Sequence, residues 1–227
     1  MIRILLVAVG VLSCVDPPKP LKKPFKVLLL GDSISIGYTN HVREIMGSQA
    51  IVFRPTYRNS GKPENCEGTT KGKDHIDRWL SSEDGAFDIV HFNFGLHDLK
   101  RINVETKKGS NNPEDPQQAA LAVYIAQLRT ITAQLVASGA QLIFATTTPV
   151  PDGGVKPHRD PDDVVRYNKA AKTLMGEFGI PVNDLYEFAL PQLEDIQHPV
   201  NVHFTEDGSR VLAQAVAQAI FMAAGHP

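Results

Sequence analysis

The chain has 227 residues, of which 42% are hydrophobic, and its formal net charge at pH 7 is −2. This length suits one domain with a substantial core. The near-neutral charge gives no electrostatic reason to expect nucleic acid as a partner.

The N-terminal stretch MIRILLVAVGVLSCV has the pattern of an export signal. One early arginine precedes an apolar run that is too short to span a bilayer comfortably. The letters VLSC also fit a bacterial lipoprotein processing site, in which Cys14 would be lipidated and attach the protein to a membrane. We therefore expect residues 1–15 to be a secretory or lipoprotein signal. A buried or disordered N-terminal segment of a cytosolic protein is the alternative.

Residues 16–24 are rich in proline and lysine and would form a linker. The protein would then be periplasmic, extracellular or anchored to the cell envelope, with one domain at residues 25–225. Removal of the signal would leave at most Cys66 as a core thiol, which excludes a disulfide framework.

From Phe25 onward, short apolar runs alternate with longer amphipathic segments. The apolar runs predict five strands, in the ranges 25–30, 50–55, 88–95, 141–149 and 180–186. The amphipathic segments predict five helices, in the ranges 37–47, 68–80, 116–139, 160–179 and 205–225.

Strand and helix alternate five times, which favours an α/β fold with a doubly wound, parallel five-stranded sheet in a three-layer α/β/α sandwich. In such sheets ligands bind at the carboxyl ends of the strands. Serine, glycine-bearing loops and two histidines follow the predicted strands, so this edge of the sheet is the expected site.

Ser33 stands directly after the first strand, in GDSIS. A serine at a strand-to-helix junction has a free backbone N–H, and its hydroxyl can act as a nucleophile beside a histidine base. The alternative is that Ser33 only caps the following helix. Asp32 in isolation is more typical of a hydrogen-bond acceptor in the turn.

Four segments in this order resemble the SGNH (GDSL-type) hydrolase superfamily, in its secreted esterase-like branch. The resemblance covers Phe25 to about Ala224 and implies the flavodoxin-like fold of that superfamily. It implies Ser33 as nucleophile and His203, in NVHFTEDG, as base. The oxyanion hole would contain the Ser33 N–H and Gly68 from NCEGTTKG, with Gly61 and Gly72 as competitors for the glycine.

The third segment reads GLHD, where the family has Gly-x-Asn-Asp. His97 therefore replaces the asparagine that donates an N–H to the oxyanion. A neutral imidazole can also donate one N–H, although this depends on its tautomer and on pH. The alternative is that His97 only packs at the end of the third strand.

The family base is usually preceded by an aspartate three residues earlier, but position 200 is Val200. The ring of His203 could instead be oriented by Asn201, by Asp195 or by a backbone carbonyl. The sequence therefore predicts a Ser-His dyad or an atypical triad.

The remaining polar residues near the strand ends receive weaker assignments. Asp32 and Asp98 are expected to accept hydrogen bonds that hold the turns around the catalytic residues in place. Lys100, Arg101 and His158 lie in loops that could contact substrate, whereas solvent exposure is the likelier account of His158 and its neighbour Arg159. No His pair or carboxylate cluster has metal-ligand spacing, so we expect no metal and no cofactor.

The leading hypothesis is a serine esterase that removes a short acyl group, most plausibly acetyl, from a carbohydrate. Only ester hydrolysis rests on residues; the carbohydrate follows from the resemblance. The alternatives are a lipid-directed esterase or acyltransferase, which the polar loops disfavour, and a catalytically weak glycan-binding protein, which the missing aspartate motivates.

Overall fold

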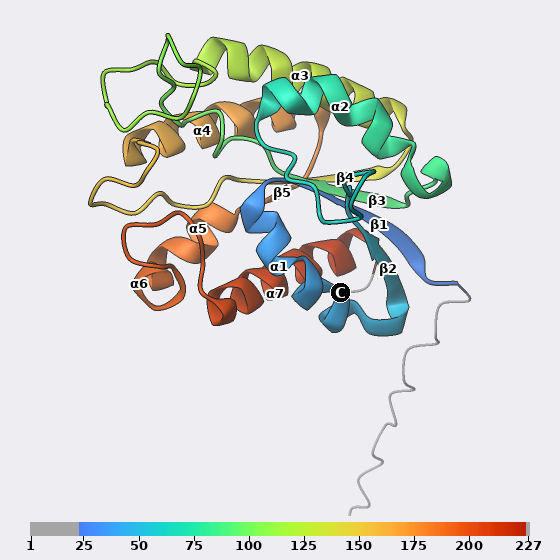
Figure 1. Ribbon diagram of the computed structural model, residues 1–227. Coiled ribbons are helices and arrows are strands. Elements are labelled where there is room, and N and C mark those ends of the chain that lie inside the picture. The colour runs from blue at the N-terminus through green and yellow to red at the C-terminus, as the bar shows by residue number, and fades with distance from the viewer. Residues whose placement is uncertain (1–22, 226–227) are drawn as a thin grey trace, which may run out of the picture.

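A five-stranded parallel sheet forms the centre of the computed structural model, which describes residues 23–225 (Figure 1). Its strands stand in the order β2-β1-β3-β4-β5. Their bounds are Phe25–Leu30 for β1, Ala50–Phe53 for β2, Ile89–Phe92 for β3, Gln141–Ala145 for β4 and Val182–Asn183 for β5. The predicted α/β fold with a doubly wound parallel sheet is confirmed.

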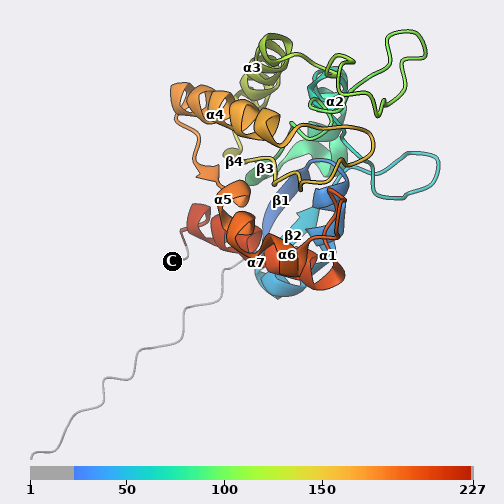
Figure 2. The same cartoon turned by 90° about the vertical axis from the view of Figure 1, so that its left-hand side faces the viewer.

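Helices cover both faces of the sheet (Figures 1 and 2). On one face lie α2, α3 and α4, and on the other lie α1 and α7 with the short α5 and α6 beside them. The helix bounds are Ser33–Met46 for α1, Thr69–Leu80 for α2, Leu121–Ala137 for α3, Pro161–Phe178 for α4, Leu185–Ala189 for α5, Leu193–Ile196 for α6 and Glu206–Ala223 for α7. Single 3-10 turns occupy Gly47–Gln49, Ser82–Gly85 and Leu190–Gln192.

The central strands are apolar because both of their faces are covered by helices. The last four residues of β1 and all four of β3 are buried. In register, Val27 of β1 lies between Val52 of β2 and Ile89 of β3. This continuous aliphatic layer holds the ends of β1 and β3 rigidly beside each other.

The five predicted strands and five predicted helices all occur, but several begin or end elsewhere. The first helix begins at Ser33 and not at position 37, and the fifth strand covers only Val182–Asn183 of the predicted 180–186.

The largest difference concerns the long third helix. The predicted helix at 116–139 begins only at Leu121. The backbone before it pairs with the loop after β3 instead, since Ile102 N–H donates to Pro116 and Gln118 N–H donates to Lys100. Non-local hydrogen bonds here replace those that a helix would supply. The short helices α5 and α6 were also not expected.

The topology places a crevice at the carboxyl ends of β1 and β3. The chain leaves β1 for β2 at the sheet edge and returns to β3 on the other side of β1. The helices that follow β1 and β3 therefore go to opposite faces (Figure 1). Such a switch point is where open α/β sheets bind ligands, and Ser33 and His97 follow these two strands.

The expected signal at residues 1–15, with Cys14, and residues 16–22 of the expected linker lie outside the described residues. Within residues 23–225, none of the helices has both the length and the apolar character that a membrane crossing needs.

Candidate active site

Ser33 is the first residue of α1, and its hydroxyl is not the cap of that helix. The cap is Asp32, whose buried carboxylate accepts a 2.9 Å hydrogen bond from the Ile34 N–H. Burial raises the pKa of Asp32, while this backbone hydrogen bond and nearby Arg159 oppose the shift. Because Asp32 satisfies the helix end, the Ser33 side chain is free for another partner.

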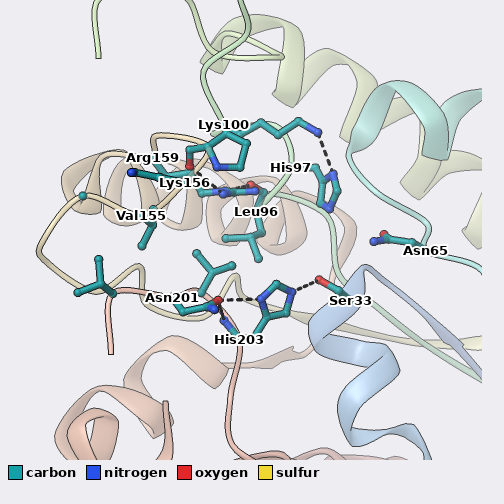
Figure 3. Close-up of a pocket in the computed structure, with 14 residues that line it drawn as sticks. Ser33, Asn65, Leu96, His97, Lys100, Val155, Lys156, Arg159, Asn201 and His203 are labelled. Carbon is teal, nitrogen blue, oxygen red and sulfur yellow. Dashed lines mark hydrogen bonds between the residues drawn. The ribbon is translucent and has the colours of Figure 1, made fainter. Parts of the chain in front are cut away.

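That partner is His203, from the loop before α7 (Figure 3). Ser33 Oγ lies 2.9 Å from His203 Nε2, and His203 Nδ1 lies 2.8 Å from Asn201 Oδ1. The fold therefore brings together two residues that are 170 positions apart in the sequence. Serine, imidazole and amide form one hydrogen-bonded chain.

The neighbours of His203 determine its tautomer. The backbone N–H of His203 also contacts Asn201 Oδ1, at 3.0 Å. A backbone N–H can only donate, so the amide of Asn201 must present its oxygen, and Nδ1 of the ring must carry the proton that reaches this oxygen. Nε2 is then an acceptor, which is the state a base needs to receive the Ser33 proton.

Asn201 lies beside Nδ1 of the His203 ring, where an orienting aspartate was expected, and Asp195 does not. Asp195 is exposed on α6 and has no contact with the His203 ring within the described structure. The ring has only one Nδ1–H to donate, and Asn201 already accepts it. Val200, directly before, has a φ of 52°, which a β-branched residue rarely adopts. The backbone at Val200 is thus strained where it delivers Asn201 to the ring.

His97 lies at the opposite wall of the site and has a different environment. Its Nδ1 is 3.3 Å from Lys100 Nζ, an ammonium that can only donate. Nδ1 is therefore the acceptor and Nε2 carries the proton. Burial, followed by repulsion from Lys100 and Arg159, lowers the pKa of His97 to about 3, so the ring is neutral at ordinary pH.

Gly68 precedes α2 and lies against Asp98. The carboxylate of Asp98 accepts a 2.9 Å hydrogen bond from the Thr69 N–H, and its oxygens lie 2.9 Å from the place a Cβ on Gly68 would occupy. Asp98 is buried, and burial raises its pKa to about 6. The carboxyl of Asp98 thus anchors the start of α2 and leaves room only for glycine at position 68. Gly68 itself does not line the cleft beside Ser33.

Asn65, from the same loop, does line that cleft and was missed in the sequence (Figure 3). Its Oδ1 accepts a 2.8 Å hydrogen bond from the Glu67 N–H. By the same donor argument, the amide NH2 is the free end of the side chain. The asparagine of NCEG could have indicated this residue, but the family resemblance pointed to the glycine of the same stretch.

The cleft has a volume of about 560 Å³ and extends from Ser33 and His203 to the loop after β4. Lys100 lines it as predicted, but Arg101 and His158 do not. Arg101 instead forms a 3.3 Å ion pair with buried Asp163, and the backbone of His158 pairs with Ser110 and Arg101. The sequence-based expectation that Arg159 is exposed is wrong: its side chain is buried and lines the cleft.

Arg54 stabilises the turn that carries Ser33 through a hydrogen bond to its backbone. Its Nη2 donates to the carbonyl oxygen of Gly31 at 3.2 Å, and the Cys66 N–H donates to the same oxygen at 3.1 Å. Cys66 is a buried free thiol whose pKa is raised to about 11 by burial, so it stays protonated.

In the described part of the chain, no three His, Cys, Asp or Glu side chains gather as metal ligands would.

Comparisons with known proteins identify a family and a shared fold. Residues 29–211 match the model of the GDSL-like Lipase/Acylhydrolase family. The search of curated proteins found no match.

Solved structures share the fold at low identity. A lipase/acylhydrolase from Enterococcus faecalis is 20% identical, with a TM-score of 0.65 over 86% of this chain and 95% of that one. An acetyl xylan esterase, AlAXEase, is 14% identical, with a TM-score of 0.65 over 86% and 100%. A catalytic mutant of an acetylxylan esterase from Geobacillus stearothermophilus is 17% identical, with a TM-score of 0.65 over 88% and 96%.

Proposed function

This chain belongs to the GDSL-like lipase/acylhydrolase family, and from that membership we propose that it removes acetyl groups from an esterified carbohydrate through an acyl-enzyme on Ser33. The family makes the protein a carboxylic ester hydrolase. The acyl group, the carbohydrate and the roles of the residues are our proposal.

One observation carries the proposal: the 2.9 Å hydrogen bond between Ser33 Oγ and His203 Nε2 at the mouth of a cleft. A serine hydroxyl is a weak nucleophile until a base removes its proton. His203 has its acceptor nitrogen on the serine, and Asn201 holds the other nitrogen. The site is therefore assembled for proton transfer before substrate binds.

The reaction has two halves. His203 takes the Ser33 proton as Oγ attacks the ester carbonyl, and the tetrahedral intermediate then expels the alcohol, which leaves with that proton. Water, deprotonated by His203, attacks the acetyl-serine. The proton on His203 then returns to Ser33 Oγ as the acetyl group leaves as acetic acid, which ionises to acetate in solvent. The imidazolium that forms in each half is stabilised by the neutral oxygen of Asn201, which is a weaker partner than a carboxylate.

Three donors are available to the oxyanion. The Ser33 N–H is at the first helical position, where no helix carbonyl accepts it. The ring of neutral His97 offers Nε2–H, and the amide of Asn65 offers its NH2 group. The Gly68 N–H expected from the sequence has no acceptor in the described structure and remains a fourth candidate. Fixed donors of this kind contribute about 3 kcal/mol each to transition-state stabilisation.

Two observations favour a small acyl group on a polar alcohol over a lipid. The cleft presents asparagine, histidine, lysine and arginine side chains among four aliphatic ones, whereas a long acyl chain would need a predominantly apolar groove. Two structural relatives are acetyl xylan esterases. An activity profile over acyl chain length tests this choice, since a preference for eight carbons or more would favour the lipid-directed alternative.

Hydrolysis of p-nitrophenyl acetate by the wild type and by Ser33→Ala tests the core of the proposal. We expect the Ser33→Ala rate to fall to background, with an unchanged circular dichroism spectrum. Equal rates would end the proposal. A fluorophosphonate probe should label Ser33 in the wild type, and a folded protein without this adduct would indicate a glycan-binding protein with no turnover.

A further inference from the structure

The cleft beside Ser33 is lined by cations without acids. Lys100, Lys156 and Arg159 line it, and none of its lining residues is Asp or Glu. Figure 3 shows these three side chains grouped at the side of the cleft away from Asn201. Neither the exposed Lys156 nor Lys100 has an ion pair within the described residues. The Lys100 ammonium lies 3.3 Å from the His97 ring, and Glu67 and Asp98 attract it only from farther away. The positive charge therefore faces the space that substrate would enter.

Arg159 is the strongest feature of this group because it is a buried cation, with only 6% of the residue exposed. Its Nε donates to the Leu96 carbonyl oxygen at 2.7 Å and its Nη1 donates to that of Pro157 at 3.2 Å. Both partners are neutral. No carboxylate of residues 23–225 lies within ion-pair distance of Arg159, and its Nη2 has no hydrogen-bond acceptor there. Asp32 attracts it only from farther away.

The other deeply buried arginine shows what a purely structural guanidinium looks like here. Arg54 donates from Nη1 to the Ser35 and Thr39 hydroxyls and from Nη2 to the Gly31 and Glu64 carbonyl oxygens. All four of its Nη hydrogens thus have acceptors, and the one N–H left without a partner in the described structure, on Nε, is buried away from the cleft beside Ser33. Arg159 leaves the Nη2 hydrogens free and faces a cleft. Bracing the Leu96 turn explains the Nε bond of Arg159, but it does not explain the free Nη2 or the neighbouring lysines.

A buried charge without an opposite charge is costly, and a bound anion offsets that cost. A guanidinium binds a carboxylate through paired hydrogen bonds, with further attraction from nearby ammonium groups. We propose that the alcohol part of the ester substrate carries a carboxylate, which binds Arg159 with Lys156 and Lys100 beside it. This inference rests on the proposed function: an acetyl group has no position for a charge, so the anion must belong to the alcohol.

Binding to Ser33→Ala protein tests the inference without relying on turnover. The probes are tri-O-acetylated methyl glucuronoside, which leaves the ester position open, and its neutral carboxamide, which has nearly the same shape. We expect isothermal titration calorimetry to show the carboxylate binding about tenfold or more tightly than the carboxamide, the size of a charge-assisted hydrogen bond. Equal affinity, or tighter binding of the carboxamide, overturns the inference.

Variants in the Ser33→Ala background locate the effect. Arg159→Met should remove the preference for the carboxylate, and Lys156→Gln should reduce it about threefold, as expected for a partly screened charge. Lys169→Gln is the matched control, because Lys169 is exposed on α4 and does not line the cleft. An equal loss in Lys169→Gln and Lys156→Gln would show a general charge effect and overturn the inference. If Arg159→Met does not fold, the Lys156 and Lys169 pair decides.

The two proposals can fail separately. If wild-type protein releases acetate equally from both acetylated probes, and Ser33→Ala binds them equally, the esterase stands and the carboxylate inference falls. If no ester is hydrolysed but the carboxylate binds preferentially and depends on Arg159, the anion site stands and the esterase proposal falls.

Discussion

The two histidines of the cleft, His97 and His203, are held in opposite tautomers by their neighbours. His203 is exposed and donates from Nδ1 to the neutral oxygen of Asn201, which leaves Nε2 as an acceptor toward Ser33. His97 is largely buried and accepts at Nδ1 from the Lys100 ammonium, which leaves Nε2 as a donor. The same side chain can thus serve as a base on one wall and as a hydrogen-bond donor on the other.

The difference shows how a family asparagine can be replaced by histidine. An amide donates at every pH, but an imidazole donates from Nε2 only in the correct tautomer. Burial and the positive charges of Lys100, Arg159 and Lys71 keep the imidazolium of His97 unfavourable, and Lys100 selects the tautomer. Within residues 23–225, no Lys or Arg side chain lies at hydrogen-bond distance from the His203 ring, whose partners are Ser33 and Asn201.

The largest expected effect comes from removing the base. His203→Ala should lower kcat for p-nitrophenyl acetate by about 10⁴- to 10⁶-fold, the upper figure being the loss that follows removal of the base in a serine protease. His203 is exposed, so the melting temperature should change little. Loss of less than tenfold in a folded variant would show that His203 is not the base.

Replacing His97 should cost less than replacing His203. His97→Ala removes one oxyanion donor and should lower kcat by about 10²- to 10³-fold. His97→Asn restores an amide donor and should keep activity within about tenfold of wild type. Steady-state kinetics of both variants check this, and similar losses in the two would show that His97 acts by packing alone.

Asn201 allows the missing acid to be tested directly. Asn201→Asp places a carboxylate beside Nδ1 of His203, where it would stabilise the imidazolium, so kcat should rise by up to about tenfold and the acid limb of the kcat/KM profile should move to higher pH. Asn201→Ala is the matched control and should lose activity. An unchanged pH profile in Asn201→Asp would mean that the carboxylate does not contact the ring.

Lys100 is expected to act through the tautomer of His97. Lys100→Met should lower kcat about threefold to tenfold. Without the ammonium, part of the His97 population would carry its proton on Nδ1, and Nε2 would then present a lone pair to the oxyanion in place of an N–H. Lys100→Arg keeps a cationic donor and should retain most of kcat. Ring ¹⁵N chemical shifts of His97 should report Nε2–H in the wild type and a mixture in Lys100→Met. A single Nε2–H form in both proteins would contradict this role.

The smallest expected effect is on stability and concerns His91, a third histidine that lies in β3 outside the cleft. Burial lowers its pKa to about 4, so it is neutral when folded but takes up a proton on unfolding below its ordinary pKa of about 6.5. The free energy of unfolding should therefore fall as the pH falls from 6.5 toward 4, by up to about 1.4 kcal/mol per pH unit from this group. His97 acts in the same direction, and Asp98, whose pKa is raised, acts in the opposite one.

His91→Gln isolates the contribution of His91. Urea unfolding at pH 7 and pH 5 should show a smaller difference for this variant than for wild type. An identical difference in the two proteins would mean that His91 does not titrate on unfolding.

Most of the fold could be predicted because periodic apolar patterns are local. The last four residues of FKVLLL and all of IVHF are buried, as their mostly apolar character predicted, and Gly179 ends α4 in a left-handed conformation. The start of α3 could not be predicted, because Pro116 and Gln118 exchange helical hydrogen bonds for pairing with a loop that is distant in the sequence.

The alternation of strands and helices follows from local apolar patterns in the sequence, and the order of GDS, GLHD and NVHF places these three segments at one edge of the sheet. The sequence could not show which nitrogen of each histidine carries the proton, because the tautomer depends on the donors and acceptors that the fold places beside the ring, here Lys100 and Asn201. The burial of Arg159 was decided in the same way: its charge suggests exposure, and only the packed loop after β4 shows a guanidinium held in the cleft.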